Sequence, residues 1–242
     1  MNLSRNSMLK INFILDQLLP PIVRDWKLFM KLPMHFVFSK KAEDVMNFKE
    51  RLPLLSTEEY VSMYEDTEPY HLSKDIYLNT RCIEAVLKDI VGSSILEVGC
   101  GRGFLVQKIC DTTEGSTLEV TATDIVLSDQ LKAMSDRIKF LKAEVSDLPF
   151  AEKEFDTVIC THVLEHVIDL KKSINELRRV ARKRLIIVVP MQRPYRYTFN
   201  LHLRFFPYVH SFLLEMMPLR KGTFSCVNMG GDIYYVENIN IA

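Results

Sequence analysis

The sequence has no excess of either charge and no cysteine framework. Its 242 residues include 31 basic and 31 acidic side chains, which gives a formal net charge of +0. A nucleic-acid-binding protein usually carries a basic excess, so we expect no nucleic-acid partner. The five cysteines are scattered and form no CxxC pair, which argues against a disulfide framework or a zinc site and favours a reducing compartment. They are Cys82, Cys100, Cys110, Cys160 and Cys226.

Long apolar runs are also missing. The longest apolar stretch without a charged residue, Phe205–Leu214, contains a proline and a histidine and is shorter than the roughly 18 residues needed to cross a bilayer. The first residues lack the pattern of a signal peptide, because Ile11–Leu19 is interrupted by polar residues and no small-residue cleavage site follows. We therefore expect a cytoplasmic protein and leave open a peripheral contact with a membrane surface.

Charge is divided unevenly over the N-terminal segment. Met1–Lys41 has seven basic residues against two acidic ones, whereas Ala42–Tyr70 has eight acidic residues against two basic ones. One interpretation is a lid that packs its apolar side on the rest of the protein and pairs these opposite charges. The other is a helix that lies on a membrane surface through residues 11–31. We favour the lid, because the acidic block opposes binding to anionic lipid.

From residue 74 the pattern alternates between short apolar runs and helical periodicity. Such alternation predicts a doubly wound α/β fold, whose mostly parallel sheet is covered on both faces. The expected strands are Ser94–Val98, Leu118–Thr123, Ile138–Leu141, Thr157–Cys160 and Leu185–Val189. Thr223–Glu237 reads as two further strands around a Gly-Gly pair, which predicts seven strands with an antiparallel hairpin at the C-terminal end.

The strongest motif is a glycine-rich turn between the first expected strand and the helix after it. Gly99, Gly101 and Gly103 occupy alternate positions there. Without Cβ atoms the backbone turns sharply and approaches a ligand closely, and the helix N-terminus offers free N–H groups. Asp124 ends the next expected strand, where a carboxylate either binds the two hydroxyls of a ribose or caps the following helix.

The residue after the glycines bears on the choice of cofactor. A dinucleotide fingerprint requires glycine or alanine where this chain has Phe104. The bulky side chain opposes the close packing of a pyrophosphate-binding helix, although an NAD(P)-linked oxidoreductase stays an alternative. A compact amino-acid carboxylate in place of the pyrophosphate removes that constraint.

Four stretches of the sequence, in this order and at these intervals, carry a family resemblance. They are ILEVGCGRG (95–103), TATDI (121–125), AEVSDLPFAEKEFDTVIC (143–160) and VLEHV (163–167). Over Lys74–Val189 the chain resembles the class I S-adenosylmethionine-dependent methyltransferases, near the ubiquinone/menaquinone-biosynthesis methyltransferase-like group. The resemblance implies a Rossmann-like fold, S-adenosylmethionine as cofactor, and methyl transfer as the activity. It also divides the chain into an extension or lid (1–73) and a methyltransferase domain (74–242), with an acceptor-side cap insert at 191–222.

The resemblance implies a role for each residue of the motifs. Glu97 holds the amino group of the cofactor, and the glycine turn presents backbone groups to its methionine part through Gly99, Cys100, Gly101 and Gly103. Asp124 binds the ribose. Three residues surround the adenine, with Glu144 in a position where the family usually has Asp. These adenine residues are Ile125, Glu144 and Val145.

The acceptor is less well defined by the sequence. An oxygen acceptor needs a base near neutral pKa, usually histidine, and His162 and His202 are the candidates, each with a competing structural interpretation. The resemblance also implies that His162 contacts the cofactor, because it follows the fourth expected strand, where the family lines the cofactor and substrate pocket. No metal is expected. The segment 192–208 resembles methyltransferases encoded among bacterial surface-polysaccharide enzymes, which implies a hydroxyl of a small molecule or of a glycan- or lipid-linked acceptor. A non-catalytic, methyltransferase-like binding subunit is a further alternative, and the oligomeric state is not predicted.

Overall fold

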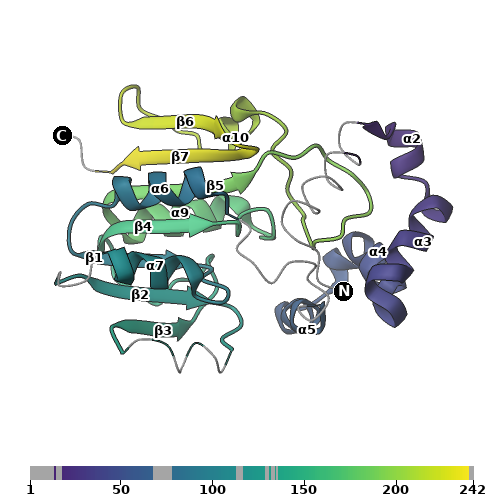
Figure 1. The fold of residues 1–242 in the computed structure, drawn as a ribbon, viewed down its shortest axis with the longest axis horizontal. Coiled ribbons are helices and arrows are strands. Elements are labelled where there is room, and N and C mark those ends of the chain that lie inside the picture. The colour runs from purple at the N-terminus through teal and green to yellow at the C-terminus, as the bar shows by residue number, and fades with distance from the viewer. Residues whose placement is uncertain are drawn as a thin grey trace. The chain divides into compact units, whose positions relative to one another are not determined.

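The computed structural model describes residues 14, 18–67, 78–112, 117–128, 131, 134 and 136–239. The chain divides into two compact units (Figure 1). One consists of residues 1–77 and 192–205, and the other of residues 78–191 and 206–242. None of the helices in these described ranges combines the length and apolar character that a membrane span requires. The apolar periodicity of the sequence also predicts helices at Ile11–Leu19 and Ser128–Met134, and both ranges fall largely outside the described residues.

The second unit is a seven-stranded sheet in the order β3-β2-β1-β4-β5-β7-β6. Its first five strands are parallel, and β7 runs antiparallel to both β5 and β6. The strands are β1 Ser94–Val98, β2 Glu119–Asp124, β3 Ile138–Lys142, β4 Phe155–Thr161, β5 Ala181–Pro190, β6 Phe224–Met229 and β7 Asp232–Asn238. The predicted α/β sheet with its antiparallel C-terminal hairpin is therefore confirmed.

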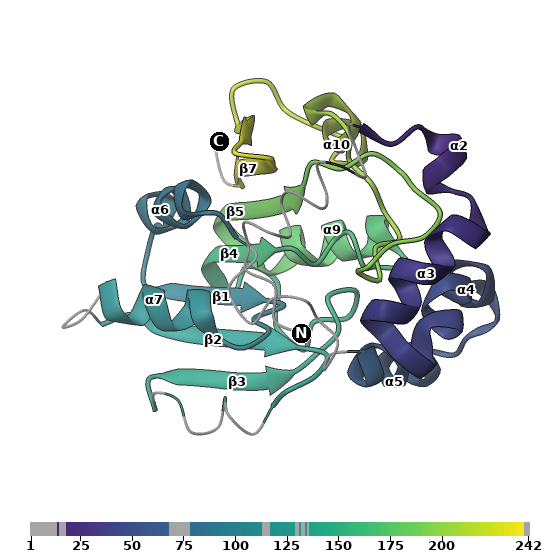
Figure 2. The ribbon, with the colours of Figure 1, turned by 45° about the vertical axis from the view of Figure 1, so that its right-hand side comes forward.

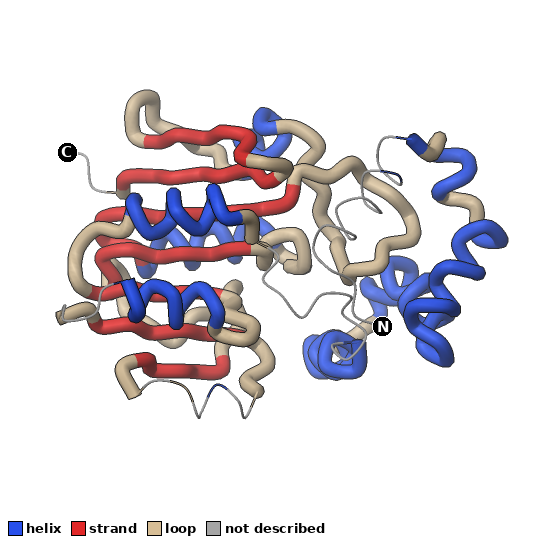
Figure 3. Tube along the Cα trace, in the orientation of Figure 1, coloured by secondary structure: helices blue, strands red, loops and turns tan. Residues whose placement is uncertain are grey.

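Four helices within the described residues accompany this sheet. Figure 3 shows α6 and α7 on one face and α9 on the other. The helices are α6 Thr80–Asp89, α7 Phe104–Thr112, α9 Leu170–Val180 and α10 Val209–Glu215. The apolar stripe of α9 is fully buried against the sheet, as its helical spacing predicts: its residues are Leu170, Ile174, Leu177 and Val180.

The sheet reverses its order between β1 and β4. The chain leaves β1 toward β2 and β3 on one side and continues to β4 and β5 on the other. In doubly wound sheets a ligand binds at such a point, outside the carboxyl ends of the strands. The residues that follow β1, β2 and β4 therefore meet where a ligand is expected.

The first unit is helical. Its elements are α2 Pro21–Arg24, α3 Lys27–Phe38, η2 Ser39–Lys41, α4 Ala42–Arg51, η3 Leu52–Leu54 and α5 Thr57–Thr67. Helices α3 and α4 run side by side (Figure 2), and the returning segment 192–205 adds Tyr197 and Leu201 to their apolar core. Lys49 Nζ also donates to the carbonyl of Tyr195 at 2.7 Å. Residues 192–205 of the predicted cap insert thus group with the N-terminal helices, and 206–222 with the sheet.

Candidate functional site

The turn between β1 and α7 has the geometry that only glycine adopts without strain. The φ angles are 78° at Gly99, 53° at Gly101 and 75° at Gly103. A Cβ atom on Gly99 would lie 2.0 Å from Cγ2 of Val163, whereas one on Gly101 would have no atom within 4 Å. Gly99 is therefore required by the packing of the protein itself. Gly101 instead borders open space, where a ligand has room to approach the backbone.

Hydrogen bonds within the fold occupy several N–H groups of this turn. Those of Gly99 and Cys100 donate to the carbonyl of Thr123 at 2.7 and 2.9 Å, and that of Gly101 donates to Asp124 Oδ2 at 2.7 Å. The N–H group of Gly103 donates to the carbonyl of Cys100 at 2.8 Å. At Gly99 and Gly101 the carbonyl oxygens remain as the polar backbone atoms that could contact a ligand. Carbonyl oxygens attract a cationic group.

Asp124 joins the end of β2 to this turn. Besides the bond from Gly101, its Oδ1 accepts from the N–H group of Val126 at 3.1 Å. Burial raises the pKa of Asp124, and these backbone bonds oppose the shift. The carboxylate thus has a structural role at the start of the following segment, as the capping alternative anticipated. A carboxylate accepts about four hydrogen bonds, so the three backbone donors at Val126, Gly101 and Ile125 leave capacity for a ligand.

Glu97 is the penultimate residue of β1, and its side chain is only 2% exposed. Its Oε2 is buried and has no hydrogen-bond partner among the residues that the structure describes. Burial, together with the nearby charge of Asp124, raises the pKa of Glu97 to about 8, although a backbone bond from Val106 opposes this. A buried carboxylate without a donor is costly. An ammonium group bound at this edge of the sheet would remove that cost.

The expected adenine residues follow β2 and β3. The N–H group of Ala143 donates to the carbonyl of Asp124 at 3.0 Å, which brings the ends of these two strands together. Glu144 is exposed, and its Oε1 accepts from the hydroxyl of Ser146 at 2.7 Å. Val145 is buried at 5% exposure, and Ile125 is half-buried directly after β2. The four residues at 124, 125, 144 and 145 therefore belong to one edge of the sheet.

His162 directly follows β4 in a left-handed conformation, with φ at 55°. Its Nδ1 lies 3.3 Å from Glu165 Oε1, and its Nε2 lies 3.5 Å from Asp232 Oδ1. Burial by itself would lower the pKa of His162, but the two carboxylates outweigh it and raise the pKa to about 10. The imidazole therefore carries a positive charge at neutral pH, held between two buried negative groups.

Sequence reasoning did not single out Asp232, Glu165 or Asn79. Asn79 caps α6 and donates from Nδ2 to Asp232 Oδ2 at 2.7 Å, which extends the polar network of His162 across the sheet. Sequence spacing does not indicate that these residues lie together, because β7 is brought near β4 only by its pairing with β5. Glu165 alone could have been suspected from the sequence, since it directly precedes the histidine of the VLEHV motif.

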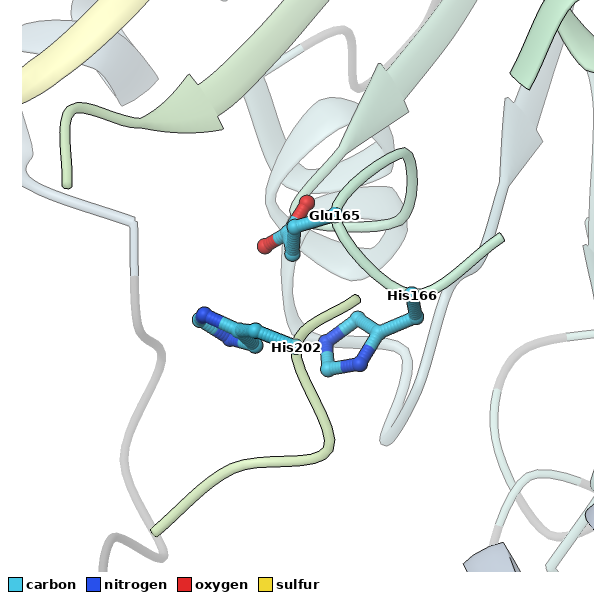
Figure 4. Close-up of side chains that lie close together, drawn as sticks. All are labelled: Glu165, His166 and His202. Atoms are coloured by element: carbon cyan, nitrogen blue, oxygen red, sulfur yellow. The ribbon is translucent and has the colours of Figure 1, made fainter. Parts of the chain in front are cut away.

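The turn after β4 carries two adjacent polar side chains, Glu165 and His166 (Figure 4). Glu165 is 1% exposed, and neither of its carboxylate oxygens accepts a hydrogen bond from the described residues. Burial raises the pKa of Asp124, and the nearby imidazole of His166 is one of the smaller effects that oppose this rise. The turn thus adds one buried anion and one imidazole to the carboxyl edge of the sheet. His202, also drawn in Figure 4, belongs to the helical unit.

Within the helical unit, His202 is 5% exposed and contacts Gln192. Its Nδ1 lies 2.8 Å from Gln192 Oε1. An amide oxygen only accepts hydrogen bonds, so Nδ1 is the donor in this contact, and Gln192 fixes the orientation of the ring.

Comparison with known proteins supports the family resemblance that the sequence motifs carry. Residues 96–189 match the family model described as a methyltransferase domain. The ubiquinone biosynthesis O-methyltransferase of Rickettsia bellii is 30% identical over 118 residues, which make up 46% of this chain and 47% of that protein. The chain spans about half the length, or less, of the curated relatives it matches.

Two solved structures share the fold. A S-adenosylmethionine-dependent methyltransferase from Aquifex aeolicus has a TM-score of 0.51 at 21% identity, over 65% of this chain and 89% of that one. The 1,6-didemethyltoxoflavin-N1-methyltransferase of Burkholderia thailandensis, solved with bound S-adenosylhomocysteine, has a TM-score of 0.53 at 16% identity, over 76% and 90% of the two chains. Residues 96–189 thus match a methyltransferase domain, and the sheet has the fold of these S-adenosylmethionine-dependent methyltransferases.

Proposed function

We propose that this protein transfers the methyl group of S-adenosylmethionine to a hydroxyl oxygen of a small-molecule, glycan-linked or lipid-linked acceptor. The observation that carries the proposal is the buried Oε2 of Glu97, which has no donor within the described residues and lies beside the glycine turn. The bound cofactor would supply a methyl group that its sulfonium activates for displacement by an acceptor oxygen.

The chain's own residues hold the two ends of the cofactor. Glu97 accepts from the ammonium group of the methionine part, beside the carbonyl oxygens of Gly99 and Gly101. Asp124 uses its remaining lone pairs for the ribose hydroxyls. Ile125 and Val145 contact the adenine, and Glu144 accepts from the adenine amino group. Holding the methyl group and the acceptor in line is the main contribution of such a protein to the rate.

A hydroxyl acceptor must also lose its proton. His202 is the proposed base, because histidine is the usual general base for a hydroxyl and Gln192 orients its ring. We assign His162 a positioning role instead, because its raised pKa leaves it already protonated at neutral pH. It holds Glu165 in the turn after β4. The Rickettsia bellii relative is an O-methyltransferase by name, which supports oxygen as the acceptor atom.

Two calorimetric titrations test the cofactor side. S-adenosylhomocysteine should bind in the micromolar range, about −8 kcal/mol, and NAD should not. Glu97→Gln should weaken S-adenosylhomocysteine but leave 5′-methylthioadenosine, which lacks the amino-acid part, unchanged. Asp124→Asn should weaken both ligands. Binding of NAD without either sulfur nucleoside would contradict the proposal and favour the oxidoreductase alternative.

Turnover is tested separately with methyl-labelled S-adenosylmethionine and a cell extract. The expected result is a labelled small molecule or glycolipid whose methyl group sits on oxygen, formed by the wild type and lost in His202→Gln. His210→Gln, which changes an exposed histidine of α10, should keep full transfer. Cofactor binding without transfer to any component of the extract would instead support the non-catalytic binding subunit.

A further inference from the structure

Helix α3 has two apolar faces, of which only one is covered. Met30, Met34 and Phe38 recur every four residues and are buried in the core of the helical unit. Leu28 and Leu32 lie on another side of the helix and are 68% and 79% exposed. A helix that is apolar on both sides normally has both sides covered. The second side of α3 therefore has the composition of a contact surface.

The exposed apolar side chains continue from α3 toward α2. Besides Leu28 and Leu32 they include Phe36, which is 73% exposed, and Ile22 of α2, which is 83% exposed. Trp26, which directly precedes α3, is 57% exposed and Phe29 is 40% exposed. We call these six residues the α3 outer face. Exposed apolar groups of this extent mark interaction surfaces, not ordinary solvent-facing residues.

The surrounding charge indicates what this face binds. Pro21–Lys41 contains five basic residues and one acidic residue. Lys27 and Lys31 both pair with the single carboxylate of Glu43, at 3.9 and 3.0 Å, so one positive charge of the three groups is left unbalanced. Their side chains are about half exposed, at 53% and 50%. The apolar face thus has a basic border.

This combination fits one occupant. Leucine, phenylalanine and tryptophan beside lysines are the residues by which an amphipathic helix enters the headgroup region of a bilayer, with the lysines at the lipid phosphates. A second copy of the chain would place like charges opposite each other across a two-fold contact, which opposes association. We propose that the α3 outer face binds peripherally to the surface of an anionic lipid bilayer.

Vesicle flotation tests the proposal without cofactor or acceptor. The full chain should float with phosphatidylcholine vesicles that contain phosphatidylglycerol, and much less with phosphatidylcholine alone. Added salt should release it, because surface charges are screened. The double variant Leu32→Glu/Phe36→Glu should lower the bound fraction about tenfold or more, since it places two anions in the face. Lys27→Gln/Lys31→Gln should reduce the preference for the anionic vesicles.

A matched control separates this face from general surface hydrophobicity. Leu54→Glu changes a leucine that is 85% exposed in η3 of the same unit and should leave flotation unchanged. Binding of S-adenosylhomocysteine should be the same in all variants, so failure of this proposal is distinct from failure of the methyltransferase assignment. The proposal is overturned if the wild type does not float, or if Leu54→Glu lowers flotation equally. Sedimentation that shows a dimer broken by Leu32→Glu, without vesicle binding, would assign the face to a second copy.

Discussion

The amide of Gly101 donates to Oδ2 of Asp124 at 2.7 Å, across the junction between the ends of β1 and β2. One carboxylate therefore closes the glycine turn and also stands where the ribose is expected. We therefore expect the stability of the empty protein and its affinity for the cofactor to be coupled through this contact.

Asp124→Ala removes the acceptor of two backbone N–H groups, those of Gly101 and Val126. We expect the free energy of unfolding without ligand to fall by about 1–2 kcal/mol, the cost of unpaired donors. Affinity for S-adenosylhomocysteine should fall at least about tenfold. Thermal melting and calorimetry measure the two effects, and Asp111→Ala, on α7, should show neither. Reduced affinity at unchanged stability would mean that the turn closes without Asp124.

Gly99→Ala should mainly lower the stability of the protein, whereas Gly101→Ala should mainly lower its affinity for the cofactor. At Gly99 the new Cβ would lie 2.0 Å from Val163, at a φ of 78°, so we expect a loss of stability above about 2 kcal/mol. Adding Val163→Ala should restore part of it. At Gly101 nothing lies within 4 Å, so the empty protein should lose only about 1 kcal/mol while cofactor affinity drops. If Gly101→Ala bound S-adenosylhomocysteine normally, the turn would not approach the ligand.

Glu97 should make cofactor binding release a proton. Its raised pKa, about 8 against an ordinary 4.5, means that the folded empty protein still holds this proton at neutral pH. The stability of the folded state then decreases as pH rises from about 4.5 through about 8, because the unfolded chain ionises first. An ammonium ligand favours the ionised form. Binding enthalpy at pH 7 should therefore vary with the ionisation enthalpy of the buffer, and in Glu97→Gln it should not. Persistence of that variation in Glu97→Gln would assign the proton to another group.

His162 should stabilise the sheet unit in a pH-dependent way. Its folded pKa of about 10 exceeds the ordinary 6.5, so its contribution is complete below pH 6.5 and is lost as pH rises through about 10. His162→Gln leaves Glu165 and Asp232 without their cation. We expect a loss of about 3 kcal/mol at pH 7, shrinking toward pH 10, in urea unfolding at several pH values. His210→Gln should follow the wild type. A difference between His162→Gln and wild type that does not change with pH would rule out the ion-pair role.

Much of the fold was predictable because it depends on local sequence. Five apolar runs marked the parallel strands, since strands buried on both faces need continuous apolar residues. The Gly-Gly pair at 230–231 marked the hairpin between β6 and β7. The glycine turn and Asp124 stood out because their spacing is set by one strand–helix–strand unit.

Other features could not be predicted from the sequence, because they depend on contacts that form only in the folded chain. His162 and Asp232 are 70 positions apart and meet because β7 pairs antiparallel with β5, beside β4. The grouping of segment 192–205 with the N-terminal helices likewise depends on long-range contacts, such as that of Lys49 with Tyr195. Neither of these two contacts is indicated by a periodic pattern in the sequence.

By itself, the sequence determined the order of strands and helices, the glycine turn and the carboxylates at the strand ends, because these depend on periodicity and on residues close along the chain. Only the tertiary structure decided which polar groups find partners. Among the described residues, it left Oε2 of Glu97 without a donor and surrounded His162 with two carboxylates. It also determined which apolar side of α3 is covered, burying Met34 and exposing Leu32. Burial and neighbouring charges together set the pKa of these groups, and both follow from packing between segments that are distant in the chain.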